Sequence, residues 1–256
     1  MVPAAVGGFG RADLHLHTRA SDGLMSTRTL LEYVERATQL DVIAITDHDE
    51  MSAAFDAREQ AARYGFRVQV VTGVEVTTRE GHLLALFVED RPPALRSLQA
   101  TAEWVLARGG LCLAPHPFTR LTHSLGSQSM LQAVEHGWLA GVEVLNPSPA
   151  GRASHARALR FAEQHRLAAV GGSDAHMLGV VGLARTRFQG DSPDDLRRAL
   201  AARTTFAEGR FASPRELAAE ALPQLARSMV HLPLRRIVRF ARGSAAERRL
   251  RTRDPR

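Results

Sequence analysis

The plainest sign of the fold is the segment Val42-Ile43-Ala44-Ile45-Thr46-Asp47-His48-Asp49, a short apolar run that ends in polar side chains. Four consecutive apolar residues, mostly β-branched, predict a buried strand. Similar runs recur along the chain and are separated by amphipathic segments, which predicts an α/β fold. The candidate strands are residues 12–17, 42–46, 68–76, 82–88, 111–115, 141–145 and 168–173.

Helical spacing of apolar residues fills the intervals between these strands. The expected helices span residues 26–39, 51–64, 93–108, 127–136, 152–165 and 191–202. Ser26 or Thr27 can cap the first of them, and Ser192-Pro193-Asp194 opens the last like a capped helix start. Strands that alternate with helices imply a mainly parallel sheet, either open or closed into a barrel, and seven strands favour the barrel.

The composition limits the possible chemistry. The chain has 256 residues, enough for one domain of α/β-barrel size with an appendage. All 33 basic residues other than histidine are arginine. The lack of lysine excludes both Schiff-base catalysis and a P-loop with its phosphate-binding lysine.

The C-terminal segment differs from the rest in charge. Residues 210–256 contain 12 arginines against four acidic residues, so the positive charge of the chain belongs to this segment, and residues 1–209 are slightly acidic. We therefore expect a catalytic barrel over 1–209 and a basic, helical and partly disordered extension over 210–256. The extension could pack as a helix with a solvated end, contact nucleic acid, or lie on a membrane surface. Pro223 and Pro233 weigh against a continuous membrane-surface helix.

Other features indicate a cytoplasmic protein. No apolar stretch approaches the ~18 residues that span a bilayer, and residues 1–10 lack the pattern of a signal peptide. The single cysteine, Cys112, lies in an apolar run and is expected to be a small buried hydrophobe.

Side chains that bind metals gather at the ends of the predicted strands. Asp13-Leu14-His15-Leu16-His17 places alternate residues on one face of a strand, which would direct Asp13, His15 and His17 the same way. Four other strands end in His48, Glu75, His116, and the segment Asp174 to His176, while His82 stands at a strand start. The carboxyl ends of parallel strands converge on one face of an α/β fold, so these side chains should be neighbours.

This set is too large for one tetrahedral metal site. With Asp22 it comprises nine histidines and carboxylates, which suit two or three divalent ions sharing a bridging carboxylate. Mixed nitrogen and oxygen ligands favour Zn²⁺, Mn²⁺ or Fe, and a water held between two such ions becomes a nucleophile for phosphoester hydrolysis. The expected metal ligands are His15, His17, Asp22, His48, Glu75, His82, His116, Asp174 and His176.

Together these motifs resemble the PHP (polymerase and histidinol phosphatase) superfamily, in order over about residues 12–190. The matching segments are 13–17, Ser21-Asp22-Gly23, Thr46-Asp47-His48, Gly73-Val74-Glu75, His116-Pro117 and residues 172–176. The resemblance implies a distorted (βα)7 barrel and a trinuclear centre. It assigns one metal to His15, His17, Glu75 and Asp174, a second to Glu75, His82 and His116, and a third to Asp22, His48 and His176.

The resemblance also implies the activity. It predicts a phosphoesterase that hydrolyses a phosphate monoester or diester through a metal-bridging hydroxide, with Asp174, His176 and Glu75 as catalytic residues. The aspartate at position 22 is similar to small bacterial members that act on nucleotides or RNA 5′ ends. Only 99 residues separate Glu75 from Asp174, too few for the domain that several such enzymes insert there. The alternatives are a histidinol-phosphate phosphatase and a non-catalytic, metal-bound nucleic-acid-binding module; an exonuclease role tied to a polymerase is weaker, since no polymerase domain is present.

Several other residues are expected to contribute to the site, on weaker sequence signals. Arg19 could bind a substrate phosphate and Asn146 could line the pocket. Asp13 and Asp47 are expected to orient neighbouring histidines instead of binding metal. Weaker substrate candidates are Arg152, Arg185 and Arg187, and the histidines expected at the solvated surface are His123, His136, His155, His165 and His231.

Overall fold

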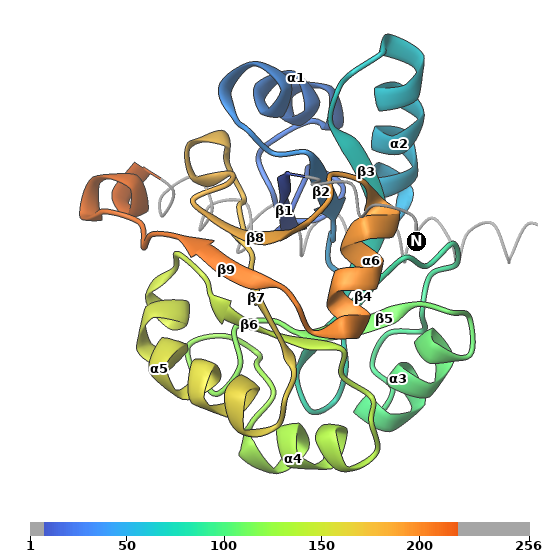
Figure 1. The fold of residues 1–256 in the computed structure, drawn as a ribbon, viewed down its shortest axis with the longest axis vertical. Coiled ribbons are helices and arrows are strands. Elements are labelled where there is room, and N and C mark those ends of the chain that lie inside the picture. The colour runs from blue at the N-terminus through green and yellow to red at the C-terminus, as the bar shows by residue number, and fades with distance from the viewer. Residues whose placement is uncertain (1–7, 220–256) are drawn as a thin grey trace, which may run out of the picture.

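The computed structural model describes residues 8–219, in which strands and helices alternate (Figure 1). The strands are β1 (Phe9–Leu16), β2 (Val42–Ile45), β3 (Gln69–Thr77), β4 (His82–Leu86), β5 (Leu111–Ala114), β6 (Gly141–Leu145), β7 (Ala168–Gly171), β8 (Ala184–Gln189) and β9 (Phe206–Gly209). The helices are α1 (Thr27–Ala37), α2 (Ser52–Tyr64), α3 (Leu98–Leu106), α4 (Ser127–Glu135), α5 (Pro149–Gln164), the 3-10 turn η1 (Leu178–Val180) and α6 (Pro193–Ala202).

The sheet has the order β7-β6-β5-β4-β3-β2-β1-β8-β9 and curves until its ends meet. At this seam the hydroxyl of Thr186 on β8 donates to the carbonyl of Gly171 on β7 (2.9 Å) and accepts from its N–H (3.1 Å). Thr205 donates to the carbonyl of Ala169. A Cβ at Gly171 would lie 2.5 Å from the carbonyl oxygen of Arg185, so only glycine allows this approach. At this seam the barrel is thus closed by side-chain hydrogen bonds and not by a ladder of backbone hydrogen bonds.

The prediction of an α/β barrel is confirmed, but the predicted strand count and sheet type differ from the structure. Residues 8–219 form nine strands, not seven, because β8 and β9 were not predicted. Arg185 and Arg187 alternate with the buried Ala184, Thr186 and Phe188, which hides the apolar character of β8. Parallel pairing holds for β1–β2, β2–β3, β5–β6 and β6–β7, whereas β3–β4, β4–β5, β1–β8 and β8–β9 are antiparallel.

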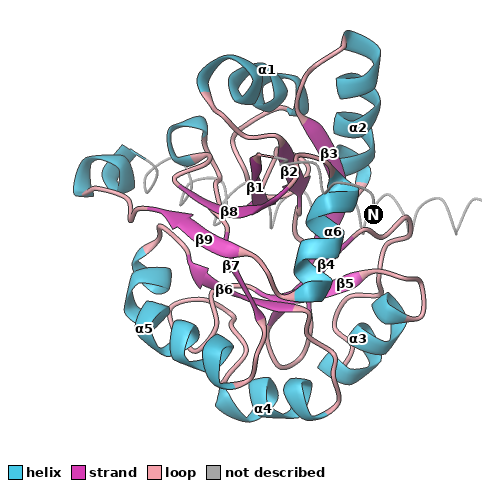
Figure 2. Cartoon of the chain, in the orientation of Figure 1, coloured by secondary structure: helices cyan, strands magenta, loops and turns pink. Residues whose placement is uncertain are grey.

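Three apolar clusters hold the barrel together. Two lie outside the sheet, one under α1 and α2 and the other under α3, α4 and α5, which surround the barrel in Figure 2. The third joins inward side chains of the strands, such as Leu14 and Phe188, with Leu196 and Leu200 of α6. Because α6 covers this cluster, apolar side chains fill one end of the barrel, and the polar centre described below occupies the other.

Local signals explain where the helices begin. Ser26 caps α1 by accepting from the N–H of Thr29, and Ser192 forms a capping box with Asp195 at α6, as expected. Helix α3 begins at Leu98, later than predicted, because Ser97 caps it. Helix α5 begins earlier than predicted, at Pro149, because Ser148 caps it.

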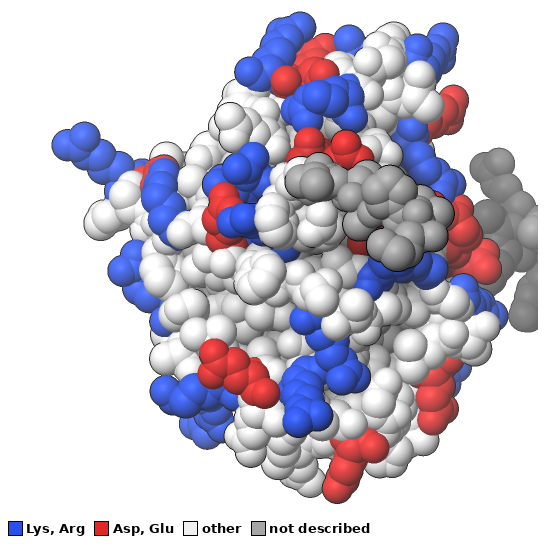
Figure 3. All heavy atoms as spheres, in the orientation of Figure 1, with Lys and Arg blue, Asp and Glu red and all other residues white. Residues whose placement is uncertain are grey.

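The surface and the C-terminal segment bear on the remaining predictions. Arginines and acidic side chains are interspersed over the face shown in Figure 3. No helix within residues 8–219 is both long and apolar enough to cross a bilayer. Most of the predicted basic extension, residues 220–256, lies outside the described residues, so its role and the domain boundary at residue 209 stay predictions.

Cys112 lies fully buried among apolar side chains on β5, and this burial raises the pKa of its thiol to about 12. The thiolate is the reactive form, so the native protein should not react with a disulfide reagent such as DTNB at pH 8. One thiol per chain should react after unfolding in urea, measured by absorbance. Rapid reaction of the native chain would contradict the packing of β5.

Candidate metal centre

All nine predicted ligand residues lie at one end of the barrel. His15, His48, His116 and Asp174 stand at or just beyond the carboxyl ends of their strands. The one exception to the sequence pattern was His82, at the start of β4, and the topology explains it. β4 is antiparallel to β3, and His82 pairs with Thr77 at the carboxyl end of β3. The start of β4 therefore belongs to the same end of the barrel.

Glu75 lies at the centre of the cluster. Its side chain is almost fully buried, and its Oε2 is 3.1 Å from His15 Nε2 and 3.2 Å from His17 Nε2. The same oxygen is 3.4 Å from His48 Nδ1. The other oxygen, Oε1, is 2.8 Å from His82 Nδ1 and 3.1 Å from His116 Nε2. One carboxylate thus faces five imidazoles.

Strand β1 has a bulge next to His15 and His17. The register of β1 with β2 shifts between Asp13 and Leu16. As a result Leu14 joins the cluster inside the barrel and Leu16 the cluster under α1, although simple alternation predicts one face for both. The two histidine rings still lie side by side, with centroids 5.1 Å apart. Their predicted proximity is therefore confirmed, but strict alternation is not its cause.

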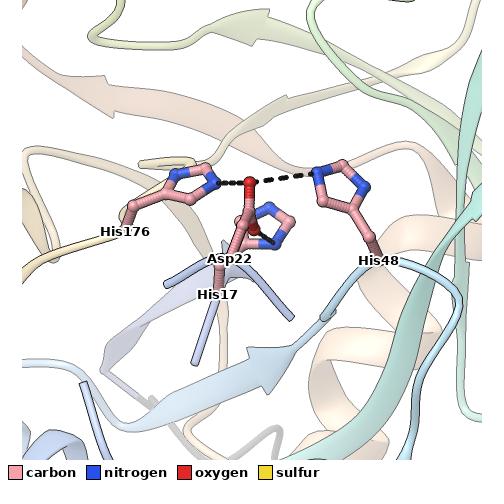
Figure 4. A group of neighbouring side chains, drawn as sticks. All are labelled: His17, Asp22, His48 and His176. Carbon is pink, nitrogen blue, oxygen red and sulfur yellow. Dashed lines mark ion pairs between the residues drawn. The ribbon is translucent and has the colours of Figure 1, made fainter. Parts of the chain in front are cut away.

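Asp22 gathers a second set of imidazoles (Figure 4). Its Oδ2 is 3.1 Å from His176 Nε2 and 3.7 Å from His48 Nε2, and its Oδ1 is 3.6 Å from His17 Nδ1. The rings of His17 and His176 are stacked at 4.2 Å. Asp22 therefore sits between rings that come from β1, from the loop after β2 and from the loop after β7.

Three groups of these side chains offer ligand atoms that lie within 4.8 Å of one another. The first is the set that the resemblance assigns to one metal. The second group contains Glu75 and His82, two of the three residues that the resemblance assigns to the second metal, together with His48. The third assigned residue, His116, is not in this group, but its Nε2 is 3.1 Å from Glu75. The third group contains all three residues that the resemblance assigns to the third metal, Asp22, His48 and His176, and also His17. The groups are His15, His17, Glu75 and Asp174; His48, Glu75 and His82; and His17, Asp22, His48 and His176.

The donor set fits divalent ions. Imidazole nitrogens and carboxylate oxygens are ligands of zinc, manganese and iron. Both ring nitrogens of His17 are buried without a well-directed hydrogen bond inside the described region, as are His82 Nδ1 and His176 Nε2. Buried polar atoms normally have partners, so these nitrogens point to a ligand. The assignment of each residue to a particular metal remains a prediction.

Charge within the centre is balanced between acids and imidazoles. Burial by itself raises the pKa of Asp174, but His15 and His17 hold it well below its ordinary value. Burial lowers the pKa of His17, yet the negative carboxylates of Asp174 and Glu75, each 3.2 Å from its Nε2, raise it to about 10. A proton on His17 therefore adds positive charge where a bound cation would otherwise supply it.

Asp47 and Asp13 hold loops, whereas the sequence led us to expect that they orient histidines. Asp47 accepts from the N–H of Thr18 at 2.7 Å and from the hydroxyl of Ser21 at 2.5 Å, which fixes the loop before Asp22. Asp13 accepts from the N–H groups of Ser173 and Gly182 at 2.9 Å each, and burial raises its pKa to about 6. The two carboxylates thus position the backbone on either side of the centre.

The predicted substrate-binding residues have different surroundings. Arg19 is exposed on the loop before Asp22, and its Nε donates to the carbonyl of Leu24. Asn146 is buried, and its Nδ2 donates to Glu143 at 2.9 Å and to Asp174 at 3.4 Å. The amide of Asn146 therefore contacts one predicted ligand, Asp174, and the neighbouring Glu143.

The weaker arginine candidates have partners elsewhere. Arg152 lies over the ring of Phe211, Arg187 over that of Phe9, and Arg185 pairs with Glu208. These contacts give no support for a place at the centre.

Sequence reasoning missed two residues near the centre. His123 is exposed, as expected, and its ring also lies 5.2 Å from that of His82, while its Nε2 contacts the carbonyl of Thr78. Glu143 is buried on β6 and contacts His15. A single acid inside the apolar run Gly141-Val142-Glu143-Val144-Leu145 was the available signal, because an isolated charge is costly in a buried strand.

Two of the ligand residues have strained backbones. Asp174 has φ of +51° and His116 has φ of +28°, a region that side chains other than glycine rarely adopt. Such strain costs about 1–3 kcal/mol per residue and persists where surrounding contacts enforce it. Among the described residues, two of the eight with positive φ other than glycine are thus predicted ligands.

Comparison with known proteins agrees with this geometry. Residues 152–205 match a family described as PHP-associated. The uncharacterized protein MJ1587 of Methanocaldococcus jannaschii is 31% identical over 147 residues, which cover 53% of this chain and 81% of that protein. A two-domain Bacteroides vulgatus protein containing a predicted PHP-like metal-dependent phosphoesterase has the same fold, with a TM-score of 0.67, 20% identity, and coverage of 86% of this chain and 70% of that one. The chain belongs to the PHP superfamily.

A further relative of this PHP protein has a named activity. The 5′-3′ exoribonuclease Rnm of Salmonella typhimurium is 42% identical over 106 residues, which are 39% of this chain and 35% of that enzyme. The match thus spans about a third of the enzyme's length.

Metal binding to this PHP protein should release protons. His17, with its pKa raised to about 10, carries a proton at neutral pH in the metal-free chain, and a ligating imidazole must lose it. Zn²⁺ affinity should therefore rise as the pH increases from 6 to 9. Calorimetric titration in buffers of different ionisation enthalpy measures the protons released. Affinity independent of pH, with no proton release, would contradict the charge balance described above.

Proposed function

We propose that this PHP protein hydrolyses phosphoesters of nucleotides or of RNA, with the 5′ end of RNA as the favoured substrate. The observation that carries the proposal is the position of Glu75, whose two oxygens face different sets of imidazoles. A carboxylate shared in this way suits adjacent metal ions. Paired ions at such a site are typical of phosphoester hydrolysis.

When bound, the metals would act as Lewis acids and would supply a nucleophile by lowering the pKa of water. The chain's own residues hold and shape this centre. Asp174 faces His15 and His17, and His176 faces Asp22, so the loop after β7 joins two of the ligand groups. We assign catalytic importance to Glu75, Asp174 and His176 because they connect the groups.

The relatives support a nucleotide or RNA substrate. Rnm is named as a 5′-3′ exoribonuclease, and a Chromobacterium violaceum relative, 36% identical over 89 residues, is named as a 3′,5′-nucleoside bisphosphate phosphatase. In this chain the residues between Glu75 and Asp174 build β4 to β7 and the helices α3 to α5, with no inserted domain among them. Partial exposure of His48, His82 and His176 leaves the centre open on one side. An open centre suits the end of a polynucleotide better than an enclosed small ligand.

Arg19 and the C-terminal segment belong to the same proposal. The exposed guanidinium of Arg19, three residues before Asp22, could bind a substrate phosphate bidentately. The arginines of residues 210–256 would add salt-dependent contacts to a nucleic acid. Both would strengthen binding of a polymer relative to that of a mononucleotide.

A substrate panel tests the function directly. The chain loaded with Mn²⁺ should release phosphate or nucleotides from short 5′-phosphorylated RNA faster than from histidinol phosphate or an aryl phosphate. Product analysis by chromatography separates mononucleotides from inorganic phosphate. Preference for histidinol phosphate would replace the RNA proposal with the monophosphatase alternative. No turnover of any substrate, with metal bound, would favour the non-catalytic nucleic-acid-binding module.

Replacement of Asp174 by Asn should abolish most activity while the fold survives. The change removes a charged partner of His15 and His17 but keeps the size of the side chain. We expect kcat to fall more than the roughly 10–100-fold that is common for residues around the ligands. Asp90→Asn is a matched control, since the side chain of Asp90 is 76% exposed and its ion pair with Arg108 is long, at 3.9 Å. Near-normal kcat for Asp174→Asn would show that the centre is wrongly assigned.

A further inference from the structure

Glu143 is a buried carboxylate that lies behind the nine predicted ligands. It occupies the middle of β6, is only 2% exposed, and is flanked along the strand by Val142 and Val144. An uncompensated charge at such a position is strongly destabilising. Its retention there requires polar partners, and the structure shows three.

These partners are all hydrogen-bond donors. Glu143 Oε1 is 3.1 Å from His15 Nδ1. Oε2 accepts from the backbone N–H of His116 at 2.8 Å and from Asn146 Nδ2 at 2.9 Å. A carboxylate accepts but cannot donate, so the hydrogen bond to His15 places a proton on Nδ1. The other ring nitrogen, Nε2, then faces Glu75 and Asp174 at 3.1 and 3.4 Å.

We propose that Glu143 is a positioning residue that fixes the ring and tautomer of His15 and the backbone of His116, and so joins two ligand groups of the centre. His15 belongs to the group with His17 and Asp174, while His116 contacts the opposite oxygen of Glu75. One carboxylate thus sets the geometry on both sides of Glu75. The inference rests on the proposed metal centre but not on its catalytic activity.

The surroundings of Glu143 are built to keep it in place. A Cβ at Gly172 would lie 2.3 Å from Glu143 Oε1 and 2.9 Å from the Cβ of His15, so the space for this contact exists only beside glycine. His116 adopts its unusual φ of +28° while its N–H donates to Glu143. Asn146 also reaches Asp174, which extends the network to a third ligand residue.

Replacement of Glu143 by Gln separates this role from simple packing, because the size is nearly unchanged. An amide has one accepting and one donating end. If the donating end faces His116 and Asn146, it opposes two N–H donors. If it faces His15, the ring must carry its proton on Nε2, and this nitrogen can no longer bind a cation.

The test measures Zn²⁺ affinity of the metal-free full chain by competition with a chromogenic chelator. Glu143→Gln should bind Zn²⁺ about 10–100-fold more weakly than the native chain. In the zinc-loaded native protein, ¹⁵N NMR should show His15 protonated at Nδ1, and this signal should change in the variant. Thr101→Val is the matched control, because the buried hydroxyl of Thr101 on α3 has no partner among the described residues and lies in a different element. It should leave both readouts unchanged.

Each result decides the inference. Native Zn²⁺ affinity and an unchanged His15 signal in Glu143→Gln would overturn it, even if the melting temperature fell, because a purely structural role lowers stability without altering the tautomer. If Glu143→Gln does not fold, Glu143→Asp is measured instead. Aspartate still only accepts but cannot reach both sides, so native affinity in that variant would also overturn the inference. If the native chain has no phosphoesterase activity, the proposed function is refuted. The comparison of Zn²⁺ affinities would still test the role of Glu143.

Discussion

The structure depends on holding one buried carboxylate, Glu75, among five imidazoles. An ionised side chain so deeply buried requires partners on every side, and the partners come from separate segments of the chain. β3 lies between β2, which leads into His48, and β4, which starts with His82. The strand order therefore surrounds Glu75 with its neighbours, and the antiparallel direction of β4 is part of that arrangement.

Several departures from ideal secondary structure lie beside the centre. β1 has a bulge between Asp13 and Leu16, next to His15 and His17, and His116 and Asp174 have positive φ angles. Buried acids hold the backbone around the centre: Asp13 binds the backbone next to Asp174, Glu143 binds that of His116, and Asp47 binds the loop before Asp22. The carboxylates and imidazoles of the centre are thus held in place by surrounding buried carboxylates, which accept hydrogen bonds from backbone and ring N–H groups.

The parts that sequence predicted are those with a strong local signal. Apolar runs identified seven strands, and the five runs that end in histidine or an acid pointed to most of the nine side chains that the structure brings together. β8 escaped because arginines alternate with its buried residues, and β9 because it is a short edge strand whose residues are mostly half-exposed. Glu143 escaped because a residue in mid-strand has no strand-end signal. The loop contacts of Asp13 and Asp47 depend on tertiary structure that spacing along the chain does not encode.

The closure of the barrel couples metal binding to the completion of folding. β1 pairs with β8, and Asp13 bonds to the backbone of Ser173, 160 residues later in the chain. Such distant contacts form late, because a long segment must first lose its conformational freedom. His15 and His17 meet Asp174 and His176 only after that step. A partly folded chain in which the loop after β7 has not reached β1 would hold an incomplete set of ligands, so a filled metal centre would mark a chain in which these distant segments have already come together.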